Sequence, residues 1–329
     1  MPIITSPQDF NVEDLYVDLR PTLGCPVRLK CEGFNFAGSV KLKAAAAMVA
    51  AAERDGVLTP DSIIIESSSG NLGIALSVIA ASKGYRFVCV TDPRCNPASM
   101  RVMRALGAEV RVISRQDGNG GFLESRIRYV QNLCESGGGY VWLNQYANAN
   151  NSQAHYAGTA PAIDRAFPDL EVLFVGAGTT GTLMGCARYF RERRRPVTIV
   201  AIDAVGSVTF GGIPERRMVP GLGTSRRPEL VDESLVDDVV HVPETETIRT
   251  VHALASHGFL FGGSTGTVVA GAARWLAAKY PGGDPVAVAI APDLGERYLD
   301  SIYEESWLRE NFAELSPELS LPGADILGV

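Results

Sequence analysis

Short runs of β-branched and aliphatic residues alternate along this chain with longer segments of helical period. Three of the runs, at residues 63–65, 87–90 and 110–113, are each followed by such a segment. A short apolar run is typical of a buried strand, and apolar positions that recur every three to four residues are typical of an amphipathic helix. The pattern predicts three strand-helix units of one parallel sheet, with helices over about 71–82, 97–106 and 123–133.

The alternation stops at a polar stretch, residues 144–153, and then starts again. Apolar runs at 172–175, 198–202 and 286–290 predict a second sheet. The fold class is therefore α/β, with two halves. A cleft is expected between them, at the carboxyl ends of the strands.

Two segments lack a clear period. Residues 208–238 are rich in Gly, Pro and charge, and long loops of this kind are often functional lids. Residues 316–329 are weakly patterned, so we expect a tail there.

Composition narrows the class of protein. Of the 329 residues, 46% are hydrophobic and 20% are charged, which excludes a disordered chain. The net charge of -7 disfavours nucleic acid as a partner, and without a run of about eighteen apolar residues we expect no membrane span. Scattered cysteines without a CxxC pair, and an N-terminus without a secretory leader, predict reduced thiols in the cytoplasm.

Lys41 precedes an Ala-rich segment of helical pattern, residues 44–52. An ammonium group is unfavourable at the amino end of a helix, because the helix dipole is positive there. We therefore expect the pKa of Lys41 to lie below its usual value, which favours a nucleophilic amine or a Schiff base. A solvated surface lysine is the alternative, and it is our interpretation of Lys43.

Two glycine-containing turns follow predicted strands and precede predicted helices. Residues 66–71 (ESSSGN) offer hydroxyls and backbone N–H groups that suit a carboxylate, or simply cap the helix. Residues 176–182 (GAGTTGT) lack the Gly-Lys-Ser/Thr ending of a P-loop and the GxGxxG spacing of a dinucleotide site. The second turn therefore predicts a phosphate cradle of another kind, with a purely structural turn as the alternative.

A third turn, residues 262–266 (GGSTG), precedes a helical pattern over 268–278. Ser264 in this turn either caps the helix or hydrogen-bonds a ring nitrogen. A lysine, an anion turn, a phosphate cradle and a late serine are together what binding of pyridoxal 5′-phosphate (PLP) requires. The cofactor would supply an electron sink.

These segments resemble the cysteine synthase and cystathionine β-synthase family, whose fold-type II PLP enzymes replace a β-substituent on an amino acid. The resemblance covers roughly residues 20–305. The family's NPGGSVKDR segment is similar to residues 35–43 (NFAGSVKLK), its TSGN loop to 68–71 (SSGN) and its GTGGT loop to 178–182 (GTTGT).

The resemblance implies a PLP-dependent transferase with two open twisted α/β domains, like the tryptophan synthase β-subunit. The larger, PLP-binding domain would span 1–36 and 145–312, the smaller, substrate-carboxylate-binding domain 37–144, and the tail 313–329. Lys41 would be the catalytic, Schiff-base residue. The other implied cofactor contacts are Asn71, Gly178, Thr179, Thr180, Gly181, Thr182 and Ser264. The implied substrate contacts are Ser68, Ser69, Gly70, Asn71 and Gln145.

Longer segments are similar to one branch of the family, in which L-glutamate replaces the phosphate of O-phospho-L-serine on the way to L-2,3-diaminopropionate. These segments are 66–76, 120–127, 144–148, 203–211, 220–229 and 292–300. By position in them, Arg126 and Tyr146 are candidates for contacts to the acceptor's carboxylates. Arginines of the 208–238 segment suit the phosphate leaving group, namely Arg216, Arg217, Arg226 and Arg227. The family also implies a homodimer.

The chain departs from the family beside the lysine, at Phe36, Ala37, Leu42 and Lys43. Donor and acceptor therefore stay open, with cysteine synthase, using sulfide, as the main alternative. A serine or threonine dehydratase, a PLP-free Rossmann oxidoreductase and a non-catalytic PLP-binding subunit are further alternatives. We expect no metal site, and we interpret the histidines as structural or surface residues, namely His155, His241, His252 and His257.

Overall fold

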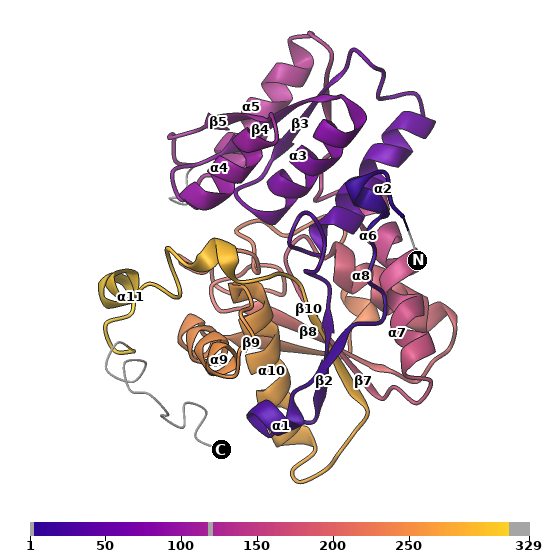
Figure 1. Cartoon of the computed structure of the whole chain (residues 1–329), viewed down its shortest axis with the longest axis vertical. Coiled ribbons are helices and arrows are strands. Elements are labelled where there is room, and N and C mark those ends of the chain that lie inside the picture. Colours follow the sequence, from indigo (N-terminus) through magenta and orange to yellow (C-terminus); the bar gives the residue numbers. More distant parts are fainter. Residues whose placement is uncertain (1–2, 118–120, 316–329) are drawn as a thin grey trace.

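Two sheets organise the chain in the computed structural model, which describes residues 3–117 and 121–315 (Figure 1). One sheet has six strands in the order β1-β2-β10-β7-β8-β9, and the other has four in the order β5-β4-β3-β6. The strands are β1 (Tyr16–Asp18), β2 (Val27–Cys31), β3 (Ile63–Ser67), β4 (Arg86–Thr91), β5 (Glu109–Val112), β6 (Tyr140–Trp142), β7 (Val172–Gly176), β8 (Thr198–Ala204), β9 (Asp238–Val242) and β10 (Ala287–Ala291).

Helices cover both sheets. The α-helices are α1 (Arg20–Leu23), α2 (Lys41–Arg54), α3 (Asn71–Lys83), α4 (Pro97–Ala105), α5 (Leu123–Glu135), α6 (Ala149–Ala154), α7 (Ala160–Ala166), α8 (Gly181–Glu192), α9 (Glu244–Ser256), α10 (Gly263–Lys279) and α11 (Glu305–Asn311). One π-helical turn, η2 (His155–Thr159), joins α6 to α7.

The four-stranded sheet is parallel and lies in the upper half of Figure 1. Its strand β3 reads IIIES and is buried along its whole length, as expected where helices cover both faces of a sheet. Helix α3 is buried from Leu72 to Ala80, so it packs on several sides. The three predicted strand-helix units of this sheet are confirmed.

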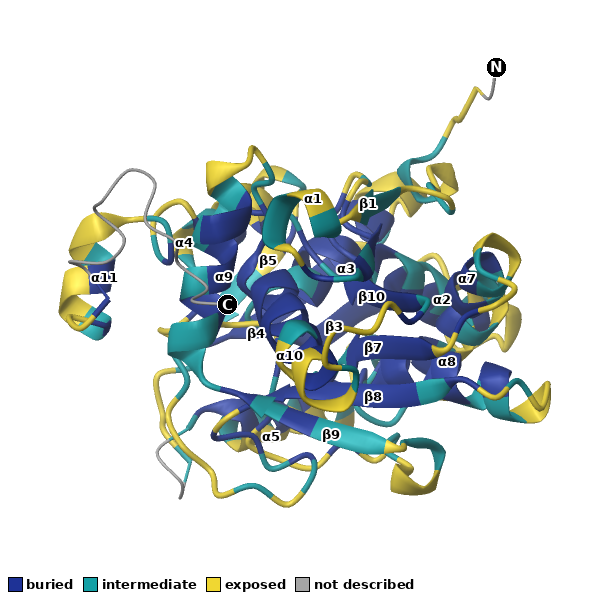
Figure 2. Cartoon of the chain, turned by 90° about the horizontal axis from the view of Figure 1, so that it is seen from below, coloured by how far each residue is buried: buried dark blue, intermediate teal, exposed yellow. Residues whose placement is uncertain are grey.

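The six-stranded sheet is parallel except for its edge strand β1, which runs antiparallel to β2. Strand β10 lies between β2 and β7, and helix α10 packs on this sheet with most of its residues buried. Figure 2 shows β7, β8, β10 and much of α10 in the buried colour. The predicted second sheet is confirmed.

Several elements differ from the sequence expectation. The polar stretch 144–153, at which the predicted alternation stops, contains the start of α6, because Asn148 caps that helix by accepting from the Asn150 N–H. Strands β1, β2, β6 and β9 were not expected. The tail expected over 316–329 lies outside the described residues.

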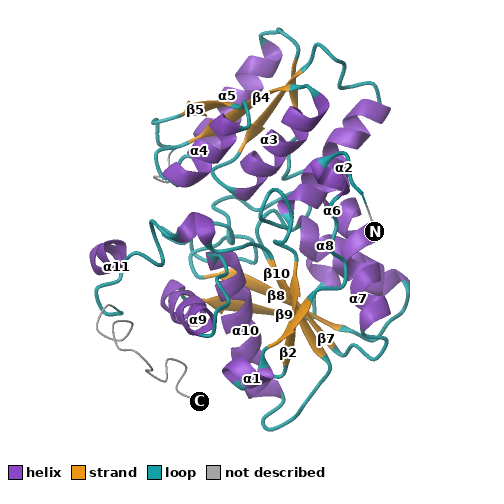
Figure 3. Ribbon diagram, viewed as in Figure 1, coloured by secondary structure: helices purple, strands orange, loops and turns teal. Residues whose placement is uncertain are grey.

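The segment 208–238 was expected to be a long loop of the kind that is often a functional lid. Its residues 214–225 line the cavity between the halves, and the Leu230 N–H donates to the Tyr146 carbonyl. Figure 3 shows that loops occupy much of the space between the two halves. In the described ranges, no helix combines the length and apolarity that crossing a membrane would require.

Helices α6 and α8 approach closely at Gly185, where a Cβ atom would overlap the Ser152 carbonyl oxygen and lie 2.8 Å from the His155 Cβ. Because backbone cannot move aside cheaply, we expect Gly185→Ala to destabilise the fold by about 2 kcal/mol. Thermal denaturation of the two proteins measures this. The matched control is Gly158→Ala, whose Cβ meets nothing within 4 Å, and an equal loss of stability in both variants would contradict the prediction.

Candidate active site

A cavity of about 880 Å³ lies between the two halves of the molecule. The smaller half contributes residues 68–71 and Arg126, and the larger half contributes Gly178, Thr179 and residues 214–225. The turns after the strands therefore meet in one cleft, as the sequence pattern predicts.

A narrower pocket continues from this cavity and is lined by Lys41, Asn71, residues 178–182, Gly221 and Ser264. The structure thus brings together every residue that was predicted to contact the cofactor. These residues come from α2, α3 and α10 and from the turn between β7 and α8, so only the tertiary fold places them side by side.

Lys41 is the first residue of α2, and its Nζ lies 3.3 Å from Thr179 Oγ1. Burial lowers the pKa of Lys41 to about 8. The direction of the shift is the predicted one, and its cause here is burial of the amine. A larger fraction of this amine is therefore neutral near neutral pH than for an exposed lysine.

The lowered pKa predicts a pH-dependent stability of the cofactor-free chain. Between about pH 8 and 10.5 the unfolded chain binds a proton at Lys41 that the folded chain does not, so this group makes stability rise with pH there. Below pH 8 the folded chain carries the full cost of the buried charge. We therefore expect Lys41→Met to be more stable than the unmodified chain near pH 7, with a difference that shrinks toward pH 10. Urea unfolding at both pH values tests this, and a constant difference would contradict it.

The turn 178–182 has the features of an anion site. Thr180 has a left-handed backbone (φ 63°), which is unfavourable for a β-branched residue, and within the part of the chain that the structure describes its buried Oγ1 has no hydrogen-bond partner. Gly181 and Thr182 begin α8, so the positive end of that helix faces the turn. A strained turn with an unpartnered hydroxyl at a helix amino end fits the phosphate of PLP.

The narrow pocket is also lined by Ser264, which is buried in the first turn of α10. Gly221 passes so close that a Cβ there would overlap the Ser264 hydroxyl. Any side chain at position 221 would therefore block the Ser264 hydroxyl. The positive φ of 117° is a second reason for a glycine at this position. A neutral hydroxyl at this place fits the ring nitrogen of PLP.

Asn71 connects the two halves of the molecule. Its Nδ2 donates to Asp293 Oδ2 at 3.1 Å, and Tyr298 donates its hydroxyl to the same carboxylate oxygen. Burial raises the pKa of Asp293. Asp293 was missed by the sequence analysis, and it fixes one N–H of the Asn71 amide.

Hydrogen bonds with neighbouring residues fix the turn 68–71. The Ser68 hydroxyl accepts from the Gly73 N–H at 2.9 Å, so helix capping does occur there. Gln145 Nε2 donates to the Ser67 carbonyl, and the buried Glu66 carboxylate accepts from Gln145 N and Trp142 Nε1. Ser68, Ser69, Gly70 and Gln145 all line the cavity.

Arg126, on α5, is buried, and its Nη1 lies 3.3 Å from Asp92 Oδ2. Among the described residues, none offers a hydrogen-bond partner to its buried Nε. Arg126 and Tyr146 both line the cavity, and burial raises the pKa of Tyr146. The Arg126 guanidinium can therefore donate further hydrogen bonds to a ligand in the cavity.

The four arginines of the loop segment separate into two pairs. Arg216 and Arg217 line the cavity, whereas Arg226 pairs with Glu229 and Arg227 with Glu233. Burial lowers the pKa of Arg217. Only the first pair is placed to meet a ligand in the cavity.

The residues that depart from the family pattern have clear surroundings. Phe36 is exposed and its ring contacts that of Phe10 edge-on, whereas Leu42 is buried. The interpretation of Lys43 as a solvated surface residue is wrong, because Lys43 pairs with the buried Glu32 at 2.8 Å and its side chain is only 18% exposed.

Asn151 was also missed by the sequence analysis, and its Nδ2 donates to Thr179 Oγ1 at 3.0 Å.

Comparison with known proteins also indicates a PLP-binding protein. Residues 16–293 match the family described as "Pyridoxal-phosphate dependent enzyme". A protein of Ralstonia nicotianae named N-(2-amino-2-carboxyethyl)-L-glutamate synthase is 39% identical over 307 residues, which are 90% of each chain. A protein of the same name from Cupriavidus metallidurans is 39% identical over 89% of this chain and 87% of its own.

Solved structures agree with this fold. That of O-ureido-L-serine synthase superposes with a TM-score of 0.83 at 31% identity, over 94% of this chain and 96% of the other. That of O-acetylserine dependent cystathionine β-synthase from Helicobacter pylori has the same TM-score at 28% identity, over 92% of this chain and all of the other.

Proposed function

The chain belongs to the family of pyridoxal-phosphate dependent enzymes, and from this premise we propose that it makes N-(2-amino-2-carboxyethyl)-L-glutamate. Its substrates are O-phospho-L-serine and L-glutamate, and phosphate is the second product. The names of the two curated relatives support this function over that of a cysteine synthase. The product leads to L-2,3-diaminopropionate for siderophore or nonribosomal peptide antibiotic biosynthesis.

PLP is the cofactor, and the narrow pocket provides a group for each of its polar ends. Lys41 would hold it covalently, the turn 178–182 would bind its phosphate, and Ser264 would face its ring nitrogen. Bound there, PLP supplies an electron sink for the negative charge that develops at Cα of the donor. Asn71 lines the same pocket with its amide fixed by Asp293.

Lys41 acts as the general base and acid in this proposal. Its neutral amine takes the Cα proton of O-phospho-L-serine, and the Cβ–O bond breaks to release phosphate. The amine of L-glutamate then forms the new Cβ–N bond and loses a proton, and Lys41 returns a proton to Cα. In the cofactor-free chain burial already lowers the pKa of Lys41 to about 8, so both protonation states of this amine are accessible near neutral pH.

The two substrates are bound by different walls of the cavity. The turn 68–71 at the amino end of α3 would hold the donor carboxylate, and Arg216 and Arg217 would hold its phosphate. Arg126 and Tyr146 would hold carboxylates of L-glutamate. The observation that carries the proposal is that one cavity joins the PLP pocket to a buried arginine with an unpartnered Nε.

The visible spectrum of the purified protein tests this function. We expect a yellow protein whose absorption changes on addition of O-phospho-L-serine and returns only when L-glutamate is added. A response to O-acetylserine and sulfide but not to these substrates would instead indicate a cysteine synthase, and release of a keto acid without an acceptor would indicate a dehydratase. A protein that never carries PLP would overturn the assignment.

Further properties are part of the same proposal. The six cysteines are free, which supports a reducing compartment such as the cytoplasm. A homodimer and the domain division at residues 37 and 145 rest on the family resemblance, and the division agrees with the separation of the strands into two sheets.

A further inference from the structure

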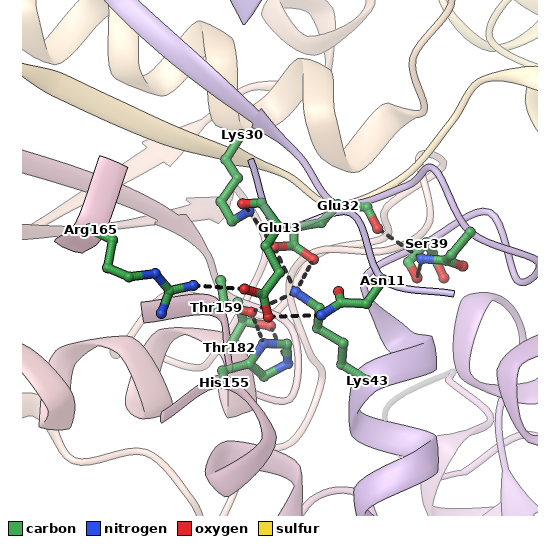
Figure 4. Close-up of polar contacts among 11 residues, drawn as sticks. Asn11, Glu13, Lys30, Glu32, Ser39, Lys43, His155, Thr159, Arg165 and Thr182 are labelled. Carbon is green, nitrogen blue, oxygen red and sulfur yellow. Dashed lines mark hydrogen bonds and ion pairs between the residues drawn. The ribbon is translucent and has the colours of Figure 1, made fainter. Parts of the chain in front are cut away.

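A continuous series of buried and partly buried polar contacts leads from Lys43 to the phosphate turn (Figure 4). Lys43 Nζ lies 3.4 Å from Thr159 Oγ1, which lies 3.0 Å from His155 Nδ1. On the other side of the ring, His155 Nε2 lies 3.2 Å from Thr182 Oγ1. His155 and Thr159 are the two ends of the π-helical turn η2, and such turns are frequent at functional sites.

The first member of the series is fixed by a buried ion cluster. The Glu32 carboxylate contacts Lys43 Nζ at 2.8 Å and Lys30 Nζ at 3.2 Å, and the side chains of Lys30 and Glu32 are at most 2% exposed. Two ammonium groups around one carboxylate leave a net positive charge. The Lys43 ammonium has no lone pair, so toward Thr159 it acts only as a donor.

This donor sets the direction of the remaining hydrogen bonds. With the Thr159 oxygen accepting from Lys43, its own O–H needs an acceptor, because Thr159 is fully buried. His155 Nδ1 is the acceptor that the described contacts offer. Burial, with the nearby charges of Lys43 and Lys41, holds the pKa of His155 well below its usual value, so the ring is neutral and its one proton is on Nε2.

We propose that His155 is a positioning residue for the phosphate of the cofactor, because its Nε2–H donates to Thr182 and leaves the Thr182 O–H free to donate into the turn 178–182. Every hydrogen bond then runs from the Lys43 ammonium toward the anion site. The inference rests on the proposed PLP site. It gives Lys43, one of the departures from the family pattern, a specific part in that site.

The tautomer of His155 tests the direction without any measurement of activity. In the holoenzyme labelled with 15N-histidine, the nitrogen chemical shifts distinguish Nε2–H from Nδ1–H, and loss of one signal set in His155→Gln assigns the residue among the four histidines. We expect a neutral ring with the proton on Nε2. A proton on Nδ1, or a charged ring, overturns the proposal.

The rate of cofactor release tests whether His155 and Thr182 together help to bind the phosphate. We expect PLP to leave His155→Leu and Thr182→Val holoenzymes about 10-fold faster than the unmodified holoenzyme, as loss of one hydrogen bond to a charged group predicts. The double variant should be no faster than either single variant, because both act through the same Thr182 hydroxyl. His155→Gln, whose amide has an acceptor and a donor, should release PLP more slowly than His155→Leu.

The controls separate the possible failures. His257→Leu removes an exposed histidine and should not change release. If the two single effects simply add, His155 and Thr182 act separately and the proposal is wrong. If His155→Leu does not fold, the tautomer in the unmodified holoenzyme decides. A protein without PLP contradicts the proposed function, whereas a PLP protein with the other tautomer contradicts only this inference.

Discussion

Lys41→Ala is expected to lower turnover of O-phospho-L-serine and L-glutamate by at least about 1,000-fold, since it removes the general base and the covalent anchor of PLP. The narrow pocket keeps its other contacts, so the variant should still bind PLP non-covalently. Steady-state turnover and the visible spectrum measure the two effects. Borohydride reduction and mass spectrometry should find the cofactor attached to residue 41 only in the unmodified protein.

The control for this substitution is Lys279→Ala, at the exposed end of α10, which should keep full turnover. Added methylamine should restore part of the activity of Lys41→Ala, because it replaces the missing base. If turnover falls less than 10-fold, Lys41 is not the catalytic lysine.

Arg126→Met is expected to raise the KM for L-glutamate by about 10- to 100-fold, the effect of losing hydrogen bonds between a guanidinium and a carboxylate. The spectral change with O-phospho-L-serine alone should persist, because the donor binds at the turn 68–71. Titration of each substrate separately measures this difference. If binding of O-phospho-L-serine and of L-glutamate weakens equally, Arg126 is not specific to the acceptor site.

Stability has to be separated from binding in this experiment. Arg126→Met leaves the buried Asp92 without its ion pair, which by itself destabilises the fold. The double variant Asp92→Asn/Arg126→Met removes that charge and should recover stability but not the KM for L-glutamate. Arg128→Met, at an exposed position of the same helix, is the matched control.

The hydrophobic pattern was sufficient to predict the repeated strand-helix units. Strand β3 and helix α3 lie within about two residues of the expected ranges, because a short run of isoleucines followed by a helical pattern has few alternative structures. Strand β6 has three half-buried residues, too few to give a period. The order of strands also depends on pairing between distant segments, which no local pattern contains.

The site was predicted wherever a short motif marks it. Lys41, the turn 178–182 and Ser264 were found in this way, and they line one pocket. Asn151 and Asp293 were missed because they act through hydrogen bonds to motif residues that are distant in sequence. His155 was interpreted as structural or surface; the fold buries it, and its proposed part depends on neighbours on other helices.

The position of β10 has a consequence for how the chain folds during its synthesis. The strands of the four-stranded sheet come from one continuous stretch, residues 63–142, and this sheet can pair as soon as that stretch has left the ribosome. Strand β2, made earlier, pairs on one edge with β10, which is made more than 250 residues later. Until then the hydrogen-bonding edges of β2 and β7 stay open, so we expect chains truncated before residue 287 to aggregate rather than to fold as partial enzymes.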